Sequence, residues 1–294
     1  MAAQLFYPDL ATVGTSHVDL TNYTLILPCE SVGNVGQLCI DLLGATLLHQ
    51  AATASSKHTS FQRIGFLHSS ALLPAAGNDA LAPASVASQG NLCTAAEVFR
   101  DTSRKIVLIQ QRAPIVKSRR REFATALTQW FTQHEFAKIL VLASIDANIR
   151  RDSQLVGLPF RYLTSPSMMH LETKLGSLGV RTVEPAADLQ FLGDRVTEKT
   201  KQRAMFAGSG IARILFEQGV MMDLPIAVLF KFCAEGDNRA DAARLASLVS
   251  QLVTVVDAPP PPSAIADSEE LPAVWQSPAS WHAVFGAPAA ASLF

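Results

Sequence analysis

Short continuous apolar runs alternate along the chain with segments in which apolar residues recur every three or four positions. The runs at 23–27 and 137–144 predict buried strands. The second is typical of a central strand, because apolar residues along a whole strand need cover on both faces. Helical spacing after Gly36, and again from Arg119 to Phe131, predicts two amphipathic helices. Strands that alternate with helices indicate an α/β fold.

Three shorter strands are predicted in the first half of the chain. One covers 63–68, and two more, at 97–100 and 105–109, are joined by the polar turn 101–103. Two strands with such a short connection are expected to form a hairpin.

The second half of the chain is predicted to be mostly helical, with helices at 167–178, 211–218 and 225–234. Pro225 suits the first turn of the third helix, where its missing N–H costs no hydrogen bond. Gly236 then ends that helix. A stripe of apolar residues from 245 to 256 predicts one more long helix, packed on the sheet.

We expect three parts in the chain: an α/β domain over residues 1–257, a linker over 258–274, and a C-terminal tail over 275–294. The linker is rich in proline at first and acidic later, which is typical of an extended spacer. The tail is short but unusually rich in large apolar side chains, which are Trp275, Trp281, Phe285, Leu293 and Phe294.

The composition favours a protein that binds another protein. Apolar residues make up 49% of the 294 residues and charged residues only 17%, which indicates apolar surface covered by a partner. The net charge is −1, so no overall field attracts nucleic acid or an anionic membrane. The one basic run, 117–121, lies at an expected helix start and is interpreted as a solvated face.

Nothing in the chain predicts secretion or membrane insertion. The cysteines Cys29, Cys39, Cys93 and Cys233 form no C-x-x-C pair, so reduced thiols are expected rather than a zinc site or disulfides. The first residues lack the basic and apolar regions of a signal peptide, and no apolar run reaches the ~18 residues of a membrane span. We therefore expect an intracellular protein that does not bind membranes.

Two loop-to-helix joints, at 31–38 and 234–238, are the sharpest local features of the sequence. The glycines at 33 and 36 lack the third glycine of a dinucleotide fingerprint and the Gly-Lys-Ser/Thr of a P-loop. They are better explained as a tight turn that lets a strand and a helix approach closely. Gly236 and the residues after it are explained as a helix break followed by a cap.

One enzymatic alternative stays open at this point. Ser144 and Asp146 follow a predicted central strand, and open α/β sheets bind ligands at the ends of such strands. Together with 31–36 they define a site for a phosphorylase- or hydrolase-like enzyme. The motif at 208–210 is not a nucleophile elbow, and no histidine is paired with a candidate nucleophile. His68, which ends a predicted strand, is the best-placed base and is more simply structural.

Six separated segments resemble, in order, the proteasome assembly chaperone 2 family: 31–38, 159–163, 227–232, 235–238, 278–281 and 285–286. The resemblance implies a non-enzymatic chaperone without cofactor or metal, found in the cytoplasm and nucleus. It implies a heterodimer with proteasome assembly chaperone 1 on the α-subunit ring of the 20S proteasome, which promotes ring formation and prevents off-pathway α-ring dimers. The implied fold is a three-layer α/β sandwich with a mostly parallel central sheet, related to nucleoside phosphorylases, plus C-terminal helices and a tail.

The resemblance also implies candidate partner-binding residues. C-terminal tails in this chaperone system dock through a hydrophobic–Tyr–any-residue ending, whereas this chain ends Ser292-Leu293-Phe294. Two outcomes are left open: the tail docks through Leu293 or Phe294, or Trp281, Phe285 and Phe294 fold back onto the domain. The full set of candidates is Asn34, Phe160, Arg161, Tyr162, Trp281, Phe285, Leu293 and Phe294.

Overall fold

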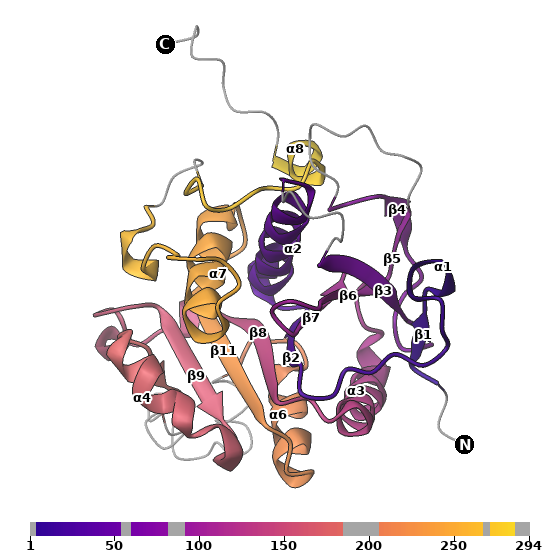
Figure 1. Ribbon diagram of the computed structural model, residues 1–294. Coiled ribbons are helices and arrows are strands. Elements are labelled where there is room, and N and C mark those ends of the chain that lie inside the picture. The colour runs from indigo at the N-terminus through magenta and orange to yellow at the C-terminus, as the bar shows by residue number, and fades with distance from the viewer. Residues whose placement is uncertain (1–3, 54–59, 82–91, 185–205, 267–270, 286–294) are drawn as a thin grey trace, which may run out of the picture.

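A mixed sheet of nine strands organises the computed structural model, which describes residues 4–53, 60–81, 92–184, 206–266 and 271–285. The order across the sheet is β1-β3-β6-β7-β2-β8-β11-β9-β10 (Figure 1). These strands are β1 (Phe6–Pro8), β2 (Thr24–Pro28), β3 (Phe61–Leu67), β6 (Ala96–Asp101), β7 (Ile106–Gln111), β8 (Lys138–Asp146), β9 (Phe160–Thr164), β10 (Arg181–Thr182) and β11 (Ile226–Cys233). A separate pair is formed by β4 (Ala76–Asn78) and β5 (Leu92–Thr94).

Three of the four parallel strand pairs lie at the centre of the sheet. The four strands β7, β2, β8 and β11 run in one direction, and β10 is parallel to β9. The pairs β1–β3, β3–β6, β6–β7 and β9–β11 are antiparallel. The α/β class is therefore confirmed, whereas a mostly parallel sheet describes the middle of the molecule and not its flanks.

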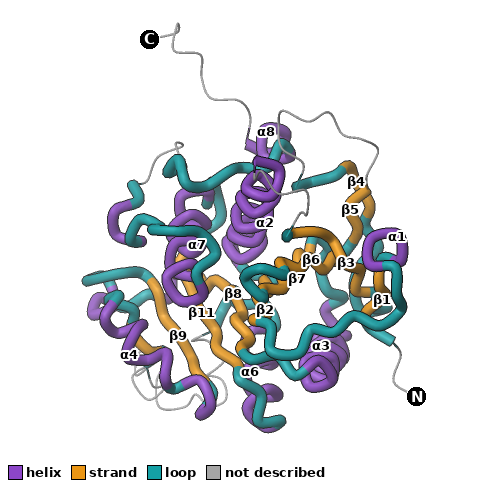
Figure 2. The backbone as a smooth tube through the Cα atoms, viewed as in Figure 1, coloured by secondary structure: helices purple, strands orange, loops and turns teal. Residues whose placement is uncertain are grey.

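Helices cover both faces of this sheet (Figures 1 and 2). Helices α2 and α7, with α4, lie on one face, and α3 and α6 lie on the other. The helices are α1 (Leu10–Val13), α2 (Val35–Thr53), α3 (Arg120–His134), α4 (His170–Ser177), α6 (Ala212–Met221), α7 (Arg239–Val253) and α8 (Ser280–Phe285).

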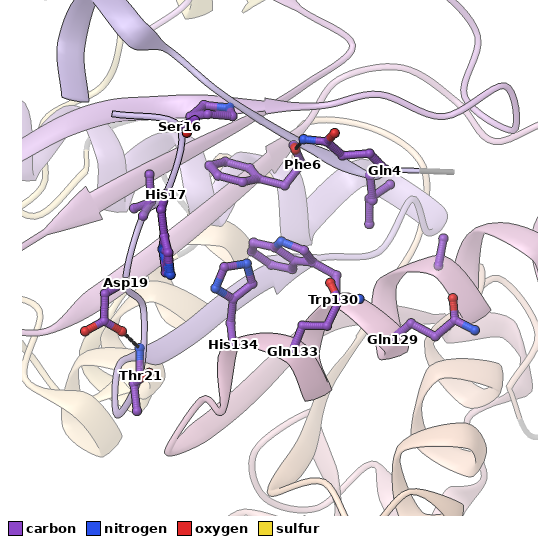
Figure 3. A pocket seen from close by; sticks show the side chains of 14 residues that line it. Gln4, Phe6, Ser16, His17, Asp19, Thr21, Gln129, Trp130, Gln133 and His134 are labelled. Carbon is purple, nitrogen blue, oxygen red and sulfur yellow. Dashed lines mark hydrogen bonds between the residues drawn. The ribbon is translucent and has the colours of Figure 1, made fainter. Parts of the chain in front are cut away.

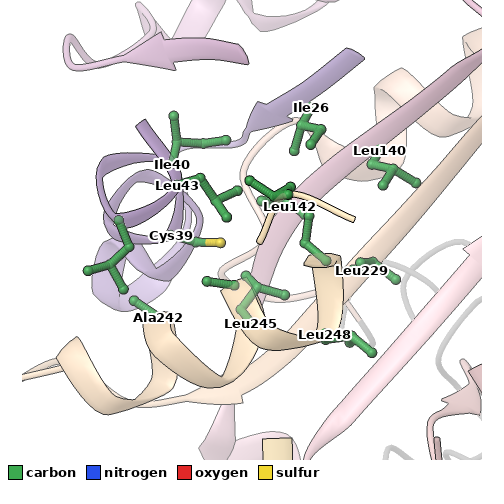
Figure 4. Close-up of a cluster of buried hydrophobic side chains, with 14 of the residues drawn as sticks. Ile26, Cys39, Ile40, Leu43, Leu140, Leu142, Leu229, Ala242, Leu245 and Leu248 are labelled. Carbon is green, nitrogen blue, oxygen red and sulfur yellow. The ribbon is translucent and has the colours of Figure 1, made fainter. Parts of the chain in front are cut away.

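Alternate residues of the central strands separate the core into two clusters. On the α2/α7 face, Leu140, Leu142 and Leu229 pack with side chains of both helices, as Figure 4 shows. On the other face, Val141 and Val228 pack against α3 and α6. Because successive side chains of a strand point to opposite faces, one apolar run supplies both clusters.

The helix predicted at 225–234 is wrong: this segment is the central strand β11. It pairs in parallel with β8 along its whole length and antiparallel with β9 on its other side. Every residue of β11 is buried, including Lys231. A short run that is apolar throughout fits a doubly covered strand as well as a buried helix, and a proline can precede either one. The neighbouring β9 was not predicted as a strand.

The C-terminal segment packs onto the helices of one face. Ile265, Trp275 and Trp281 are buried in the cluster formed by α2 and α7, and Phe285 contacts it. Trp281 and Phe285 thus lie on the domain, while Leu293 and Phe294 lie outside the described residues, and partner binding by these four residues stays a prediction. The division into domain, linker and tail stays a prediction.

No helix in the described part of the chain is both long and apolar enough to cross a membrane.

Candidate functional site

The two loop-to-helix joints meet at the carboxyl end of the parallel strands. One follows β2 and the other follows β11, so the sheet brings them to the same edge. Gly33 has a φ of +66°, and a Cβ on it would lie 2.5 Å from Asn238 Nδ2. The Asn238 amide donates to the carbonyl oxygens of Ala234 and Gly236 at 3.0 and 3.1 Å. A glycine at 33 is thus required both by its backbone conformation and by the contact between the joints.

Ser31 and Ser144, the residues of the enzymatic alternative, are hydrogen-bonded to each other at this edge. Ser31 Oγ donates to Ser144 Oγ at 3.3 Å and accepts from the Ser144 backbone N–H at 3.0 Å. Both residues are buried. Ser31 follows β2, and Ser144 lies in the neighbouring strand β8. Ser144 and Asp146 belong to β8 itself, which extends two residues beyond the predicted run. This geometry ties the β2 joint to the sheet.

A cavity of about 550 Å³ opens beside Ser31. Its carboxylates are already engaged in part: Glu30 accepts from the Ile115 N–H and Asp146 from the Asn148 N–H, both at 2.9 Å. Among the described residues that line it there is no histidine, cysteine or lysine to act as a base for a serine. The lining residues are Glu30, Ser31, Val32, Asn34, Arg120, Asp146, Phe206, Gly208, Ser209, Gly210 and Glu235.

The thiol that is hydrogen-bonded to this joint is not activated. Cys233 Sγ donates to the Val32 carbonyl oxygen at 3.1 Å. Burial raises the pKa of the Cys233 thiol to about 11, so it is protonated at neutral pH. All four cysteines are free, and in the part of the chain described no group of three or more His, Cys, Asp or Glu is placed to hold a metal ion.

A second hollow, of about 890 Å³, lies at the outer end of α3 (Figure 3). Residues 4–21 form one wall, and the other wall is the end of α3 with Trp130 and His134, whose ring centroids lie 4.9 Å apart. Burial lowers the pKa of His134, and nearby His17 lowers it further. Sequence reasoning missed this hollow because one wall is a segment with no motif and the other combines Trp130, from the apolar stripe of α3, with polar residues beside it.

The candidate residues of β9 are part of the core. Phe160, Arg161 and Tyr162 are 0%, 1% and 8% exposed. Arg161 donates through Nε to Glu184 at 2.8 Å and through Nη1 to the Phe160 carbonyl oxygen at 2.7 Å. Asn34, in contrast, is exposed in the β2 joint with a φ of +51°. Partner binding by these four residues stays a prediction.

Trp281 and Phe285 are held on α2 and α7 by polar as well as apolar contacts. Trp281 Nε1 donates to Asp41 Oδ2 at 3.2 Å, and the Trp281 and Phe285 rings lie 5.7 Å apart. The guanidinium of Arg239 lies 4.9 Å from the Phe285 ring centroid. Together these contacts hold the short helix α8 against α2 and α7.

Asp41 is a buried carboxylate that sequence reasoning did not single out. Besides Trp281, it accepts hydrogen bonds from Gln110 Nε2 at 2.6 Å and Arg112 Nη2 at 2.9 Å. Asp41 is the one acidic residue of the largely apolar helix α2, and this could have indicated a buried carboxylate. A buried charge requires partners, so the position also indicated a polar network.

Comparisons with known proteins agree with the six matched segments. The PAC2 family model matches residues 25–271. The chain belongs to the PAC2 family. Curated relatives cover nearly the whole length: proteasome assembly chaperone 2 of Nematostella vectensis is 36% identical over 241 residues, with 82% of this chain and 92% of that protein covered. Proteasome assembly chaperone 2 of Homo sapiens is 31% identical over 286 residues, with 96% and 98% covered.

Solved structures share the fold of this PAC2 family member at low sequence identity. Pyrococcus furiosus PbaA, described as an archaeal homolog of proteasome-assembly chaperone, superposes with a TM-score of 0.52 at 15% identity, over 84% of this chain and 87% of that one. A Thermoplasma acidophilum protein of unknown function gives a TM-score of 0.53 at 12% identity, over 80% and 77%. These likenesses concern the fold alone. A relation to nucleoside phosphorylases stays a prediction.

Proposed function

We propose that this protein is a non-enzymatic chaperone for assembly of the 20S proteasome. The observation that carries the proposal is the 31–36% identity, over nearly the full length, to proteins named proteasome assembly chaperone 2. The hydrogen-bonded serines, and the absence of a histidine, cysteine or lysine among the described lining residues of the adjacent cavity, support a role in binding rather than catalysis.

Its partner in this proposal is proteasome assembly chaperone 1, and the heterodimer acts on the α-subunit ring to promote ring formation and prevent α-ring dimers. The low charge content of the chain favours an apolar interface, of about 2,000 Å² or more if the pair is obligate. Leu155 and Val156 are adjacent in one loop and 58% and 73% exposed, and we expect such an interface to cover them. The proposed site of action is the cytoplasm and nucleus.

The last residues of the chain are proposed to contact the α ring. Leu293 and Phe294 provide apolar side chains, and a terminal carboxylate can pair with a lysine of a pocket. Trp281 and Phe285 then act as the anchor from which the tail extends, since both are fixed on α2 and α7.

Affinity purification of the tagged protein from its own cells, with native mass spectrometry, tests this function. Recovery of a second chaperone and α subunits, with few mature catalytic subunits, is the expected result. Recovery of the protein alone would overturn it.

The enzymatic alternative is favoured only by the meeting of the Ser31 and Ser144 joints beside a cavity. Thermal unfolding in the presence of nucleosides and phosphate distinguishes it, because a ligand at 100 times its Kd stabilises a protein by about 2.7 kcal/mol. We expect no shift in the melting temperature; a shift lost on Ser31→Ala would support an enzyme.

A further inference from the structure

A groove of about 750 Å³ runs between the starts of α3 and α6. The two helices pack against each other, and Gln218 Nε2 of α6 donates to Thr125 Oγ1 of α3 at 3.0 Å. In Figure 1 both helices lie on the face of the sheet opposite α2 and α7. The groove is lined by Lys117, Ser118, Arg120, Arg121, Phe206, Ser209, Gly210, Arg213, Ile214 and Glu217.

The groove carries positive charge that the described residues do not neutralise. Glu217, its only acidic lining residue among those described, pairs with Arg213 at 2.7 Å. The side chains of Lys117, Arg120 and Arg121 form no hydrogen bond or ion pair with any described residue. Three cations thus share one groove on a chain whose net charge is −1.

The neighbouring arginine of the same basic run is different, which shows that the run is not uniformly solvated. Arg119 pairs with Glu122 at 2.7 Å and donates to the Ser70 carbonyl oxygen at 2.7 Å. Arg119 thus holds the start of α3 against the loop that contains Ser70. Lys117, Arg120 and Arg121 line the groove instead.

The groove also has an apolar floor. Phe206 and Ile214 are half-buried in its wall, and the Phe206 ring lies 5.5 Å from that of buried Phe230. A free anion would gain nothing from these side chains. A peptide that presents carboxylates with an apolar side chain between them would use both features.

The charge reverses where the groove continues into the cavity beside Ser31. The two hollows share Arg120, Phe206, Ser209 and Gly210, and the second adds Glu30, Asp146 and Glu235. A uniformly anionic polymer such as nucleic acid would meet these carboxylates as it extended. A protein segment with a short acidic stretch ends before them.

We propose that the groove between α3 and α6 binds an extended acidic segment of a partner protein, through Lys117, Arg120 and Arg121 with an apolar residue on Phe206. Because the groove is defined by its own charges, this binding does not depend on the proposed role in proteasome assembly.

Peptide binding to the purified full-length chain tests this. The probe is a fluorescent peptide of repeated Glu-Glu-Leu, measured by anisotropy in about 0.1 M salt, so that screening does not remove the interaction. The double variant Lys117→Glu/Arg121→Glu is expected to bind about tenfold more weakly. Its matched control is Lys174→Glu/Arg181→Glu, which reverses one exposed lysine and one exposed arginine on α4 and β10 and is expected to bind within about twofold of the unchanged chain.

Four results would overturn the proposal. The first is that the unchanged chain does not bind the peptide, and the second is that both double variants lose the same amount of peptide affinity. The third is that inorganic phosphate displaces the labelled peptide at the same concentration as unlabelled peptide does. The fourth is that a single-stranded oligonucleotide binds more tightly than the peptide through the same two residues. Circular dichroism of the variants verifies that they fold. A repeat with Phe206→Ala is expected to weaken binding of the Glu-Glu-Leu peptide but not of a peptide of glutamate alone.

Discussion

Helices α2 and α7 on one face of the sheet are covered again by residues 271–285, whereas the described part of the chain leaves the outer sides of α3 and α6 in solvent. Helix α2 is accordingly buried around its first three turns, and even its polar Asp41 and Thr46 are enclosed. Helix α3 buries one side, with Phe123 and Phe131, and exposes Gln129 and Gln133 on the other.

This difference separates two uses of a helix in the same fold. A helix that is apolar on all sides must be buried on all sides. Helix α2 packs on the sheet with one side, and residues 271–285 cover its other side. An amphipathic helix needs cover on one side only, and its free side is then available for charges such as those of the α3/α6 groove. We expect the double-covered face to contribute more to stability, and the single-covered face offers the surface on which we propose recognition.

The largest expected effect comes from removing the second layer at its centre. Trp281→Ala deletes a buried indole that packs on α2 and is expected to lower the free energy of unfolding by about 3–5 kcal/mol. Trp281→Phe keeps most of the volume but loses the hydrogen bond to Asp41 and part of the ring packing, so it is expected to cost less, about 1–2 kcal/mol. Urea denaturation measures both. Equal stability of Trp281→Ala and the unchanged chain would contradict the cover that the C-terminal segment gives to α2.

The next effect is expected at the carboxylate beneath this indole. Asp41→Asn replaces an acceptor of three hydrogen bonds by an amide with one acceptor oxygen and removes the charge opposite Arg112. We expect a loss of about 1–3 kcal/mol in the free energy of unfolding. Asp223→Asn removes the same charge from an exposed residue with a φ of +54°, where asparagine is well tolerated, and serves as the control. If the two substitutions changed the free energy of unfolding equally, the hydrogen bonds of Asp41 would not contribute more to stability than an exposed charge does.

The central strands and the helices with a clear stripe were predictable from local pattern. The apolar run of β8, the polar turn between β6 and β7, and the spacing of α3 each indicate one structure, and each is confirmed. The strand β11 was not predictable in this way, because a segment buried on every side has no periodicity to distinguish strand from helix.

Contacts between distant segments were beyond the sequence pattern. The hydrogen bond between Trp281 and Asp41 joins residues 240 positions apart, and nothing local to either residue indicates it. The meeting of Ser31 and Ser144 was anticipated, since both lie at the ends of neighbouring parallel strands. The groove was not anticipated. A basic run at the start of a helix has the same sequence pattern whether it lines a groove or lies in solvent.

On the single-covered face we expect a smaller loss from an aromatic deletion. Phe206→Ala removes a half-buried ring from the groove floor and is expected to cost about 1 kcal/mol, below the value for a fully buried phenylalanine. Phe206→Leu, which keeps apolar contact with Phe230, is the conservative control. A loss as large as that of Trp281→Ala would show that this face depends on its surface residues as strongly as the other, and would remove the distinction between them.

The smallest effect is expected from His134, at the open end of α3. Burial, and then the nearby His17, lower the pKa of His134 below its ordinary value of 6.5, so folding favours the neutral imidazole. The stability that this group contributes is present above pH 6.5 and is lost as the pH falls through its lowered pKa in the folded chain, because the unfolded chain then binds a proton that the folded chain does not.

His134→Gln is therefore expected to reduce the loss of stability between about pH 7.5 and about pH 5.5, as measured by urea midpoints. The exposed His68→Gln controls for removal of an imidazole elsewhere on the same sheet edge. An unchanged pH dependence in His134→Gln would mean that the hollow at the end of α3 is as open to water as the outer side of that helix. The single cover of α3 would then extend to its last turn, where His134 would be as solvated as the outer Gln129 and Gln133.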